Sequence, residues 1–109
     1  MREKVIENKI KECLASRGHK IWFFKHAASA SMKKGIPDII CCICGHFVGI
    51  EVKQANGHQS DEQKVVESNF LEAGGEYWLV YSYEEFVDKF NSFVRRIKNE
   101  RRKGDISGN

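Results

Sequence analysis

The sequence predicts a single α/β domain, a mixed β-sheet flanked by helices, with elements in the order α-β-β-β-α-β-α. Two patterns predict this class. Apolar residues recur at steps of three and four in three segments, the period of an amphipathic helix, and four shorter segments are rich in β-branched and aromatic residues, which favour strands. The chain has 109 residues, 41% hydrophobic and 30% charged, with one proline. We therefore expect one domain over residues 1–100 and no room for a second.

The first predicted elements lie in the N-terminal part of the chain. Helical spacing predicts a helix over residues 3–17, and Gly18 supplies its C-terminal stop. A short aromatic run predicts a strand over residues 20–25. The small, polar and basic residues 26–35 predict a loop, the kind of segment in which binding groups tend to lie.

A β-hairpin is predicted next. Pro37 can open a strand but cannot sit in its centre, so the first strand spans residues 38–43. Residues 44–46 form the turn, and the return strand spans residues 47–53. Two consecutive strands joined by so short a turn pair antiparallel.

The C-terminal half is predicted to alternate helix, strand and helix. A polar loop over residues 54–59 ends at Ser60, and Gln63 follows three residues later in the pattern of a capping box. The remaining predicted elements are a helix over residues 61–73, a strand over residues 76–81, a helix that begins at Ser82 and carries apolar residues to Ile97, and a basic, flexible tail over residues 101–109.

Basic residues gather at the two ends of the chain and acidic residues in its middle. Residues 1–34 carry a net charge of +6, residues 35–94 of −7 and residues 95–109 of +4, although the whole chain carries only +3. Basic ends favour a polyanionic partner. An acidic middle favours a bound cation.

Hydropathy and cysteine usage indicate the compartment. No apolar run approaches the roughly 18 residues that span a bilayer, so we expect a cytoplasmic protein without a membrane segment. Cys41, Cys42 and Cys44 crowd into one apolar run, where disulfides between them are awkward. A zinc site would need a second pair of ligands that the sequence does not show. Small buried strand residues are the plainer interpretation, and both interpretations stay open.

Two acids of the predicted hairpin carry the chemistry. With the turn at its predicted place, Asp38 lies about opposite Val52, within a residue or two of Glu51. Two convergent carboxylates suit Mg²⁺, which keeps several waters and also binds substrate phosphate. Lys53 and Gly49 share a strand face with Glu51. The lysine can therefore contact a metal-bound water or a phosphate, and the glycine leaves the approach open.

The ordered set of motifs resembles the VRR-NUC type of domain in the PD-(D/E)xK nuclease superfamily, over about residues 3–90. The matching residues are Glu7, Gly35, Pro37-Asp38, Glu51-Val52-Lys53, Ser60-Asp61-Glu62-Gln63 and the segment from Gly74 to Tyr81. The resemblance implies a restriction-endonuclease-like core. It also implies a metal-dependent endonuclease that hydrolyses DNA phosphodiester bonds.

The resemblance further implies a metal site on the hairpin. Asp38, Glu51 and the backbone carbonyl of Val52 would hold one or two Mg²⁺ or Mn²⁺ ions, which activate water and polarise a phosphoryl oxygen. Lys53 would orient the water and stabilise the charge that grows in the transition state. These residues are the expected catalytic and metal-binding set.

Two further residues are expected to support this site. Glu7 would complete the outer metal shell from the first helix, and Gln63, counted with the catalytic residues, would hold Lys53 or a water. Each has a plainer alternative. The capping box alone explains Gln63, and Glu7 can be a surface acid, with Glu3 as a less favoured substitute ligand.

DNA contact is expected at five basic residues. Lys25, Lys33 and Lys34 lie in or beside the predicted loop, and Arg95 and Arg96 begin the basic C-terminal run. Solubility is the alternative role for the lysines. Stand-alone members of the family imply a symmetric pair acting on branched or Holliday-junction DNA, so we expect a homodimer. Part of the apolar face of the third helix is one candidate for its interface.

Two alternative functions remain at this level. One is a nucleic-acid-binding module that uses the same fold without cutting, which is disfavoured because every charged position that the reaction needs is present. The other is a nuclease that acts on nicked, flapped or linear DNA. The residues support phosphodiester hydrolysis and do not separate these substrates.

Overall fold

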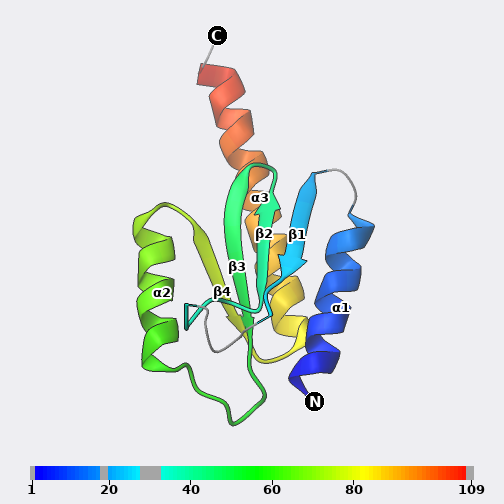
Figure 1. The fold of residues 1–109 in the computed structure, drawn as a ribbon. Coiled ribbons are helices and arrows are strands. Elements are labelled where there is room, and N and C mark those ends of the chain that lie inside the picture. The colour runs from blue at the N-terminus through cyan, green and yellow to red at the C-terminus, as the bar shows by residue number, and fades with distance from the viewer. Residues whose placement is uncertain (1, 18–19, 28–32, 108–109) are drawn as a thin grey trace.

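The computed structural model describes residues 2–17, 20–27 and 33–107. Its elements follow the predicted order (Figure 1). They are α1 (Glu3–Ser16), β1 (Ile21–Lys25), β2 (Ile39–Ile43), β3 (His46–Val52), α2 (Asp61–Glu72), β4 (Glu76–Val80) and α3 (Tyr83–Ser107). The predicted fold class is confirmed. The central part of the predicted loop, residues 28–32, lies outside the described residues.

The four strands form one mixed sheet in the order β1-β2-β3-β4. The pairs β1–β2 and β2–β3 are antiparallel, whereas β3 and β4 are parallel. A parallel pair needs a long crossover, and α2 supplies it. In Figure 1 α2 stands on the β4 side of the sheet, away from β1.

The turn between β2 and β3 has two residues. Cys44 and Gly45 have φ values of 51° and 85°, which is the left-handed conformation that a tight hairpin turn of the primed type requires at both positions. The register that follows pairs Ile39 with Ile50. Asp38 therefore lies one residue before the first paired residue of β2, opposite Glu51. This is one residue from Val52, the partner that the sequence predicts.

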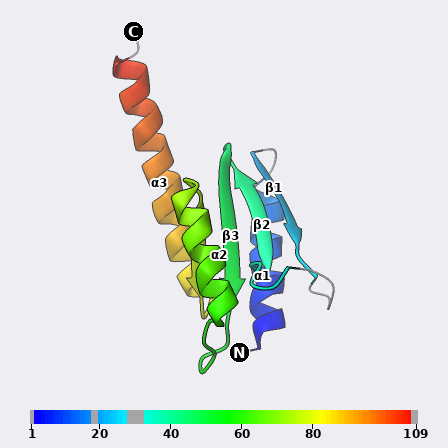
Figure 2. The same ribbon diagram turned by 60° about the vertical axis from the view of Figure 1, so that its left-hand side comes forward.

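The hydrophobic core lies between the sheet and the helices α1 and α3. Alternate strand residues and one stripe of each helix are buried there, as the strand and helix periods require. Figure 2 shows α1 behind β2, and its core residues pack with those of α3 and of the sheet in one cluster. The core residues are Ile6, Ile10, Leu14, Ile39, Cys41, Ile43, Val48, Ile50, Val52, Trp78, Val80, Phe86, Phe90, Phe93 and Ile97.

Helix α3 is longer than expected, and its apolar face covers the sheet. It continues through Ser107, so the backbone has no break at residue 100, and the flexibility of the basic tail stays a prediction. Its aromatic residues Phe86, Phe90 and Phe93 are 0–4% exposed because they cover the chain's own sheet, so these rings are closed to a partner. None of the described helices contains an apolar stretch long enough to cross a membrane.

The opposite face of the sheet is covered by α2. Phe70 of α2 stacks on Phe47 of β3 at 4.8 Å between ring centroids and meets Tyr77 of β4 edge-on at 5.5 Å. Gly49 of β3 lies directly beneath the ring of Phe70. A Cβ at this position would lie 2.7 Å from Phe70 Cε2 and 2.7 Å from Pro37 Cγ. The expectation that Gly49 leaves an open approach is therefore wrong, because two side chains fill that space.

The cysteines are free and differ in burial. Cys41 lies in the core, Cys42 points to the other face of β2 and is exposed, and Cys13 and Cys44 are half-buried. No group of three or more His, Cys, Asp or Glu residues able to hold a metal ion occurs among the described residues. The adjacent Cys41 and Cys42 face opposite sides of the sheet. Burial, with a smaller contribution from Cys42, raises the pKa of the Cys41 thiol from 9.0 to about 12.

The raised pKa of Cys41 predicts thiol reactivity. At pH 8 to 9 we expect Cys42 to react with a thiol reagent while Cys41 stays protonated, because the thiolate is the nucleophile. Burial of the protonated Cys41 thiol contributes to the free energy of unfolding below pH 9. This contribution is lost as the pH rises from 9 toward 12, because Cys41 releases its proton at a lower pH in the unfolded chain than in the folded protein. Timed labelling of Cys42→Ser and Cys41→Ser checks this. Loss of the fast-reacting thiol in Cys41→Ser, and not in Cys42→Ser, would contradict it.

The close packing at Gly49 predicts a specific coupling. Gly49→Ala should lower the free energy of unfolding by about 1–3 kcal/mol, because the added methyl group overpacks the contact with Phe70. In the Phe70→Leu background the same substitution should cost less, since the smaller side chain leaves room. Urea denaturation of the two single variants and the double variant measures the coupling. Strict additivity of the two losses would refute the close contact.

Candidate metal site

Asp38 is locked to the end of β3. Its Oδ2 atom accepts a hydrogen bond of 2.7 Å from the backbone N–H of Val52. The residue before it, Pro37, is buried and has no backbone N–H. The chain can therefore enter β2 there without leaving a backbone donor unpaired in the sheet. The side chain of Asp38 remains 27% exposed. One of its oxygens is thus anchored while the other faces outward.

Glu51 is a carboxylate inside the protein. It is 1% exposed, and its Oε1 atom accepts hydrogen bonds from the hydroxyl of Tyr77 and from Nε2 of Gln59, the latter at 3.4 Å. Its Oε2 atom is buried and has no hydrogen-bond donor among the described residues. The nearest cation is Lys53 Nζ, at 3.6 Å from this oxygen.

The unpartnered oxygen of Glu51 fits a divalent cation. Buried polar atoms are nearly always satisfied, and an exception asks for an unseen partner such as an ion. Hard carboxylate and carbonyl oxygens are the ligands of Mg²⁺. No group of three or more His, Cys, Asp or Glu residues able to hold an ion occurs among the described residues. Of the four expected ligands, Asp38 and Glu51 lie opposite one another at the end of the hairpin, whereas Glu7 contacts Lys25. Asp38, Glu51 and the carbonyl of Val52 are the oxygen donors that would suit such an ion.

Tyr77 and Gln59 hold Glu51 in place, and the sequence reasoning missed both. Burial and the neighbouring Glu51 raise the pKa of Tyr77 above its ordinary value of 10.0, so its hydroxyl stays protonated and donates. Gln59 Nε2 also donates to Glu67 Oε1 at 3.0 Å, which ties the loop to α2. Period-two alternation in β4 puts Tyr77 on the face of the sheet that α2 covers. This alternation is the sequence pattern from which the contact of Tyr77 with Glu51 could have been predicted. Nothing in the loop sequence marks Gln59.

Glu7 and Lys25 lie on the other side of Asp38. Lys25 Nζ lies 3.4 Å from Glu7 Oε1 and 3.8 Å from Asp38 Oδ1, so one ammonium group bridges two acids. Glu7 is 7% exposed, which excludes the alternative of a surface acid. It reaches the site through Lys25. Glu3, the substitute ligand, instead accepts a bond of 3.3 Å from the backbone N–H of Gln54.

Gln63 closes the N-terminus of α2. Its Oε1 atom accepts from the backbone N–H of Ser60 at 2.8 Å, and its own N–H donates to Ser60 Oγ at 3.1 Å. This is a complete capping box, the plainer of the two interpretations. The described hydrogen bonds of Gln63 include none to Lys53. A catalytic role for Gln63 therefore rests on the resemblance alone.

The five basic residues expected at DNA divide into two groups. Lys25 lies in the site, and the exposed Lys33 and Lys34 line a shallow pocket beside the first turn of α2. Arg95 and Arg96 lie on α3. Arg96 forms an ion pair with Glu76 of β4. Glu76 lies opposite Val48 in β3. Val48 is four residues, or about 13 Å along the strand, from Val52 at the site. The structure thus brings Lys25 to Asp38, leaves Lys33 and Lys34 beside Asp61 and Glu62 of α2, and places the two arginines away from the site.

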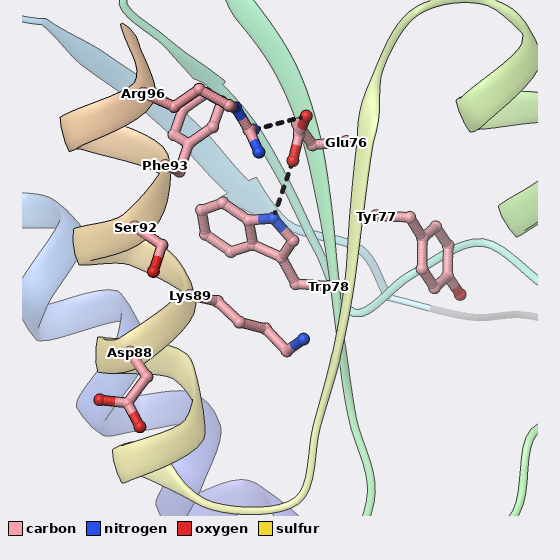
Figure 3. A pocket seen from close by; sticks show the side chains of 8 residues that line it. All are labelled: Glu76, Tyr77, Trp78, Asp88, Lys89, Ser92, Phe93 and Arg96. Carbon is pink, nitrogen blue, oxygen red and sulfur yellow. Dashed lines mark hydrogen bonds and ion pairs between the residues drawn. The ribbon is translucent and has the colours of Figure 1, made fainter. Parts of the chain in front are cut away.

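A second cavity, larger than the pocket beside Lys33 and Lys34, lies between β4 and α3. It measures about 380 Å³. Glu76 organises it, because its two oxygens accept from Trp78 Nε1 at 3.3 Å and from Arg96 Nη2 at 2.8 Å (Figure 3). Figure 3 also shows Tyr77 pointing to the other side of β4, away from this cavity. In this cavity the charges of Glu76 and Arg96 pair with each other. The oxygen of Glu51 that has no hydrogen-bond donor among the described residues lies on the other face of the sheet.

The contact between Tyr77 and Glu51 predicts a metal-binding defect. Tyr77→Phe should weaken Mn²⁺ binding about 10- to 100-fold, because the carboxylate loses the hydroxyl that orients it. Isothermal titration calorimetry measures the affinity. Tyr81→Phe is the matched control, since the hydroxyl of Tyr81 bonds to the carbonyl of Gly57 instead. An equal loss in both variants would show that Tyr77 does not act through Glu51.

Comparisons with known proteins support the fold. No family model and no curated protein matches the sequence. A solved structure described as "VRR_NUC domain" superposes with a TM-score of 0.66 at 23% identity, covering 83% of this chain and 94% of that chain. Another, "VRR_NUC domain protein", gives 0.69 at 15% identity, covering 87% and 89%. The fold that the motifs implied is confirmed: this chain has the fold of a VRR_NUC domain.

Proposed function

We propose that this protein is a nuclease that hydrolyses DNA phosphodiester bonds with Mg²⁺ or Mn²⁺. One observation carries the proposal. The buried Glu51 has an oxygen without a hydrogen-bond donor, next to Lys53 and opposite the anchored Asp38. The fold shared with VRR_NUC structures adds support.

Each residue of the site has a distinct task in this proposal. Asp38, Glu51 and the carbonyl of Val52 would hold the ion, which when bound supplies Lewis acidity and an activated water. Lys53 places a positive charge beside Glu51, where the phosphoryl oxygens gain negative charge in the transition state. Tyr77 keeps the carboxylate of Glu51 in one orientation, so the site does not reorganise during the reaction.

The lysines around the site are proposed to bind the DNA backbone. Lys25 offsets part of the negative charge of Glu7 and Asp38, which otherwise repel a phosphate. Lys33 and Lys34 extend the positive charge toward α2. Binding through these groups follows counterion release and weakens as salt is added.

The substrate and assembly are further parts of the proposal. We favour branched or Holliday-junction DNA cut by a homodimer, because a two-fold pair presents two sites to two strands. The buried aromatic face of α3 is closed to that contact, so the dimer must use another surface. A reducing, cytoplasmic compartment suits the four free cysteines.

The proposed site predicts which substitutions abolish cleavage. Linear, nicked, flapped and four-way DNA are incubated with Mg²⁺ and wild-type protein, Asp38→Ala or Lys53→Ala. Lys53→Ala should lower the cleavage rate about 10²- to 10³-fold through lost transition-state stabilisation, and Asp38→Ala at least as much through lost metal binding. Chelation with EDTA should stop the reaction.

Lys64→Ala is the matched control, because Lys64 is an exposed lysine of α2. It should cut at the wild-type rate. Cleavage that both site variants retain would overturn the proposed site. Wild-type protein that binds all four substrates and cuts none with either metal would instead be a non-cleaving binding module.

A further inference from the structure

On the face of the sheet that α2 covers, no helix or strand of the described residues packs over β1. Trp22 is 66% exposed and Phe24 43%, although both lie within a strand. They pair with Cys42, which is also exposed, and with Ile40, which is half-buried. Phe47, the other cross-strand neighbour of Cys42, is 50% exposed. We call these five residues the aromatic shelf.

The shelf is more than scattered surface hydrophobicity. Single exposed apolar residues are normal, but a contiguous apolar patch marks a binding surface. The rings of Trp22 and Phe24 lie together, with 5.6 Å between centroids and an angle of 55° between planes. Both keep much of their surface exposed to solvent, a geometry suited to a flat ligand.

The shelf begins beside the candidate metal site. Asp38 precedes Ile40 by two residues, so by strand alternation it belongs to the same face. Phe24 is followed by Lys25, whose Nζ atom lies 3.8 Å from Asp38 Oδ1. Trp22 lies two residues further along β1, about 7 Å away. Along β1, Phe24 and Trp22 thus lie about 7 and 13 Å from the position opposite Asp38, a span that a few nucleotides of a strand held at the metal site would cover.

Charge selects the class of ligand. Lys20 and Lys25 are exposed at the two ends of β1. Lys25 Nζ lies 3.4 Å from Glu7 Oε1 and 3.8 Å from Asp38 Oδ1, so a phosphate would meet this ammonium group at the end of the shelf nearest Asp38. Cations combined with exposed aromatic faces are the pattern of single-strand binding, in which phosphates meet the charges and unstacked bases lie on the rings. A second copy of the chain would instead bring its own lysines against these. We propose that the aromatic shelf stacks unpaired nucleobases next to the scissile phosphate, an inference that rests on the proposed function.

Tryptophan fluorescence tests this proposal in EDTA, so that no strand is cut. The chain has two tryptophans, and Trp78 is 5% exposed, so Trp22 is the reporter of the surface. A single-stranded oligonucleotide should quench it. An abasic oligonucleotide of the same length, which keeps the phosphates without the bases, should not, and neither should a blunt duplex.

Trp22→Leu keeps an apolar side chain without a ring. It should weaken single-strand binding about 5- to 150-fold, the range for loss of one stacked base, and leave duplex and abasic binding unchanged. Leu71→Ala, at another exposed apolar residue, is the matched control and should bind like the wild type. Melting curves of Trp22→Leu confirm that the variant is folded.

Two results would overturn the shelf. One is equal binding of normal and abasic strands with no effect of Trp22→Leu. The other is Trp22 emission that changes with protein concentration in the absence of DNA, together with a dimer mass that Trp22→Leu abolishes, since a second copy would then cover the shelf. Failure of the nuclease proposal is distinct. It appears as absent metal-dependent cleavage while base-dependent quenching persists.

Discussion

The two-residue turn at Cys44 and Gly45 is the constraint on which the site depends. A hairpin register that slips by one residue sends every side chain of a strand to the opposite face. The left-handed turn sets the pairing that brings Asp38 opposite Glu51. With any neighbouring register, Glu51 would point into the apolar core and the two carboxylates could not share a cation.

Burial gives Glu51 its chemical character. A buried carboxylate is costly unless it is paired and hydrogen-bonded. Tyr77 and Gln59 satisfy one oxygen, and the other faces Lys53 without a hydrogen bond. The parallel pairing of β3 with β4 makes this possible, because it carries Tyr77 to the same face as Glu51. Among the described residues the second oxygen of Glu51 has no hydrogen-bond donor, and it is the position that the proposed cation would take.

The segregation of charge along the chain is only partly a segregation in space. Lys25, from the basic N-terminal block, lies between Glu7 and Asp38. Arg96, from the basic C-terminal block, pairs with Glu76 of the acidic middle. Counting charges along the sequence therefore indicated DNA contact at both ends, whereas packing places Lys25 beside Asp38 and pairs Arg96 with an acid away from it.

Local patterns were enough to predict the order of the elements and the capping box at Ser60, because periodicity and turn chemistry act over a few residues. Contacts across the sheet were not predictable in this way. Tyr77 and Gln59 hold Glu51 from distant segments, Phe70 covers Gly49, and α3 continues where composition indicated a tail. Those features depend on which strands are neighbours and what each helix covers, and only the packed chain decides that.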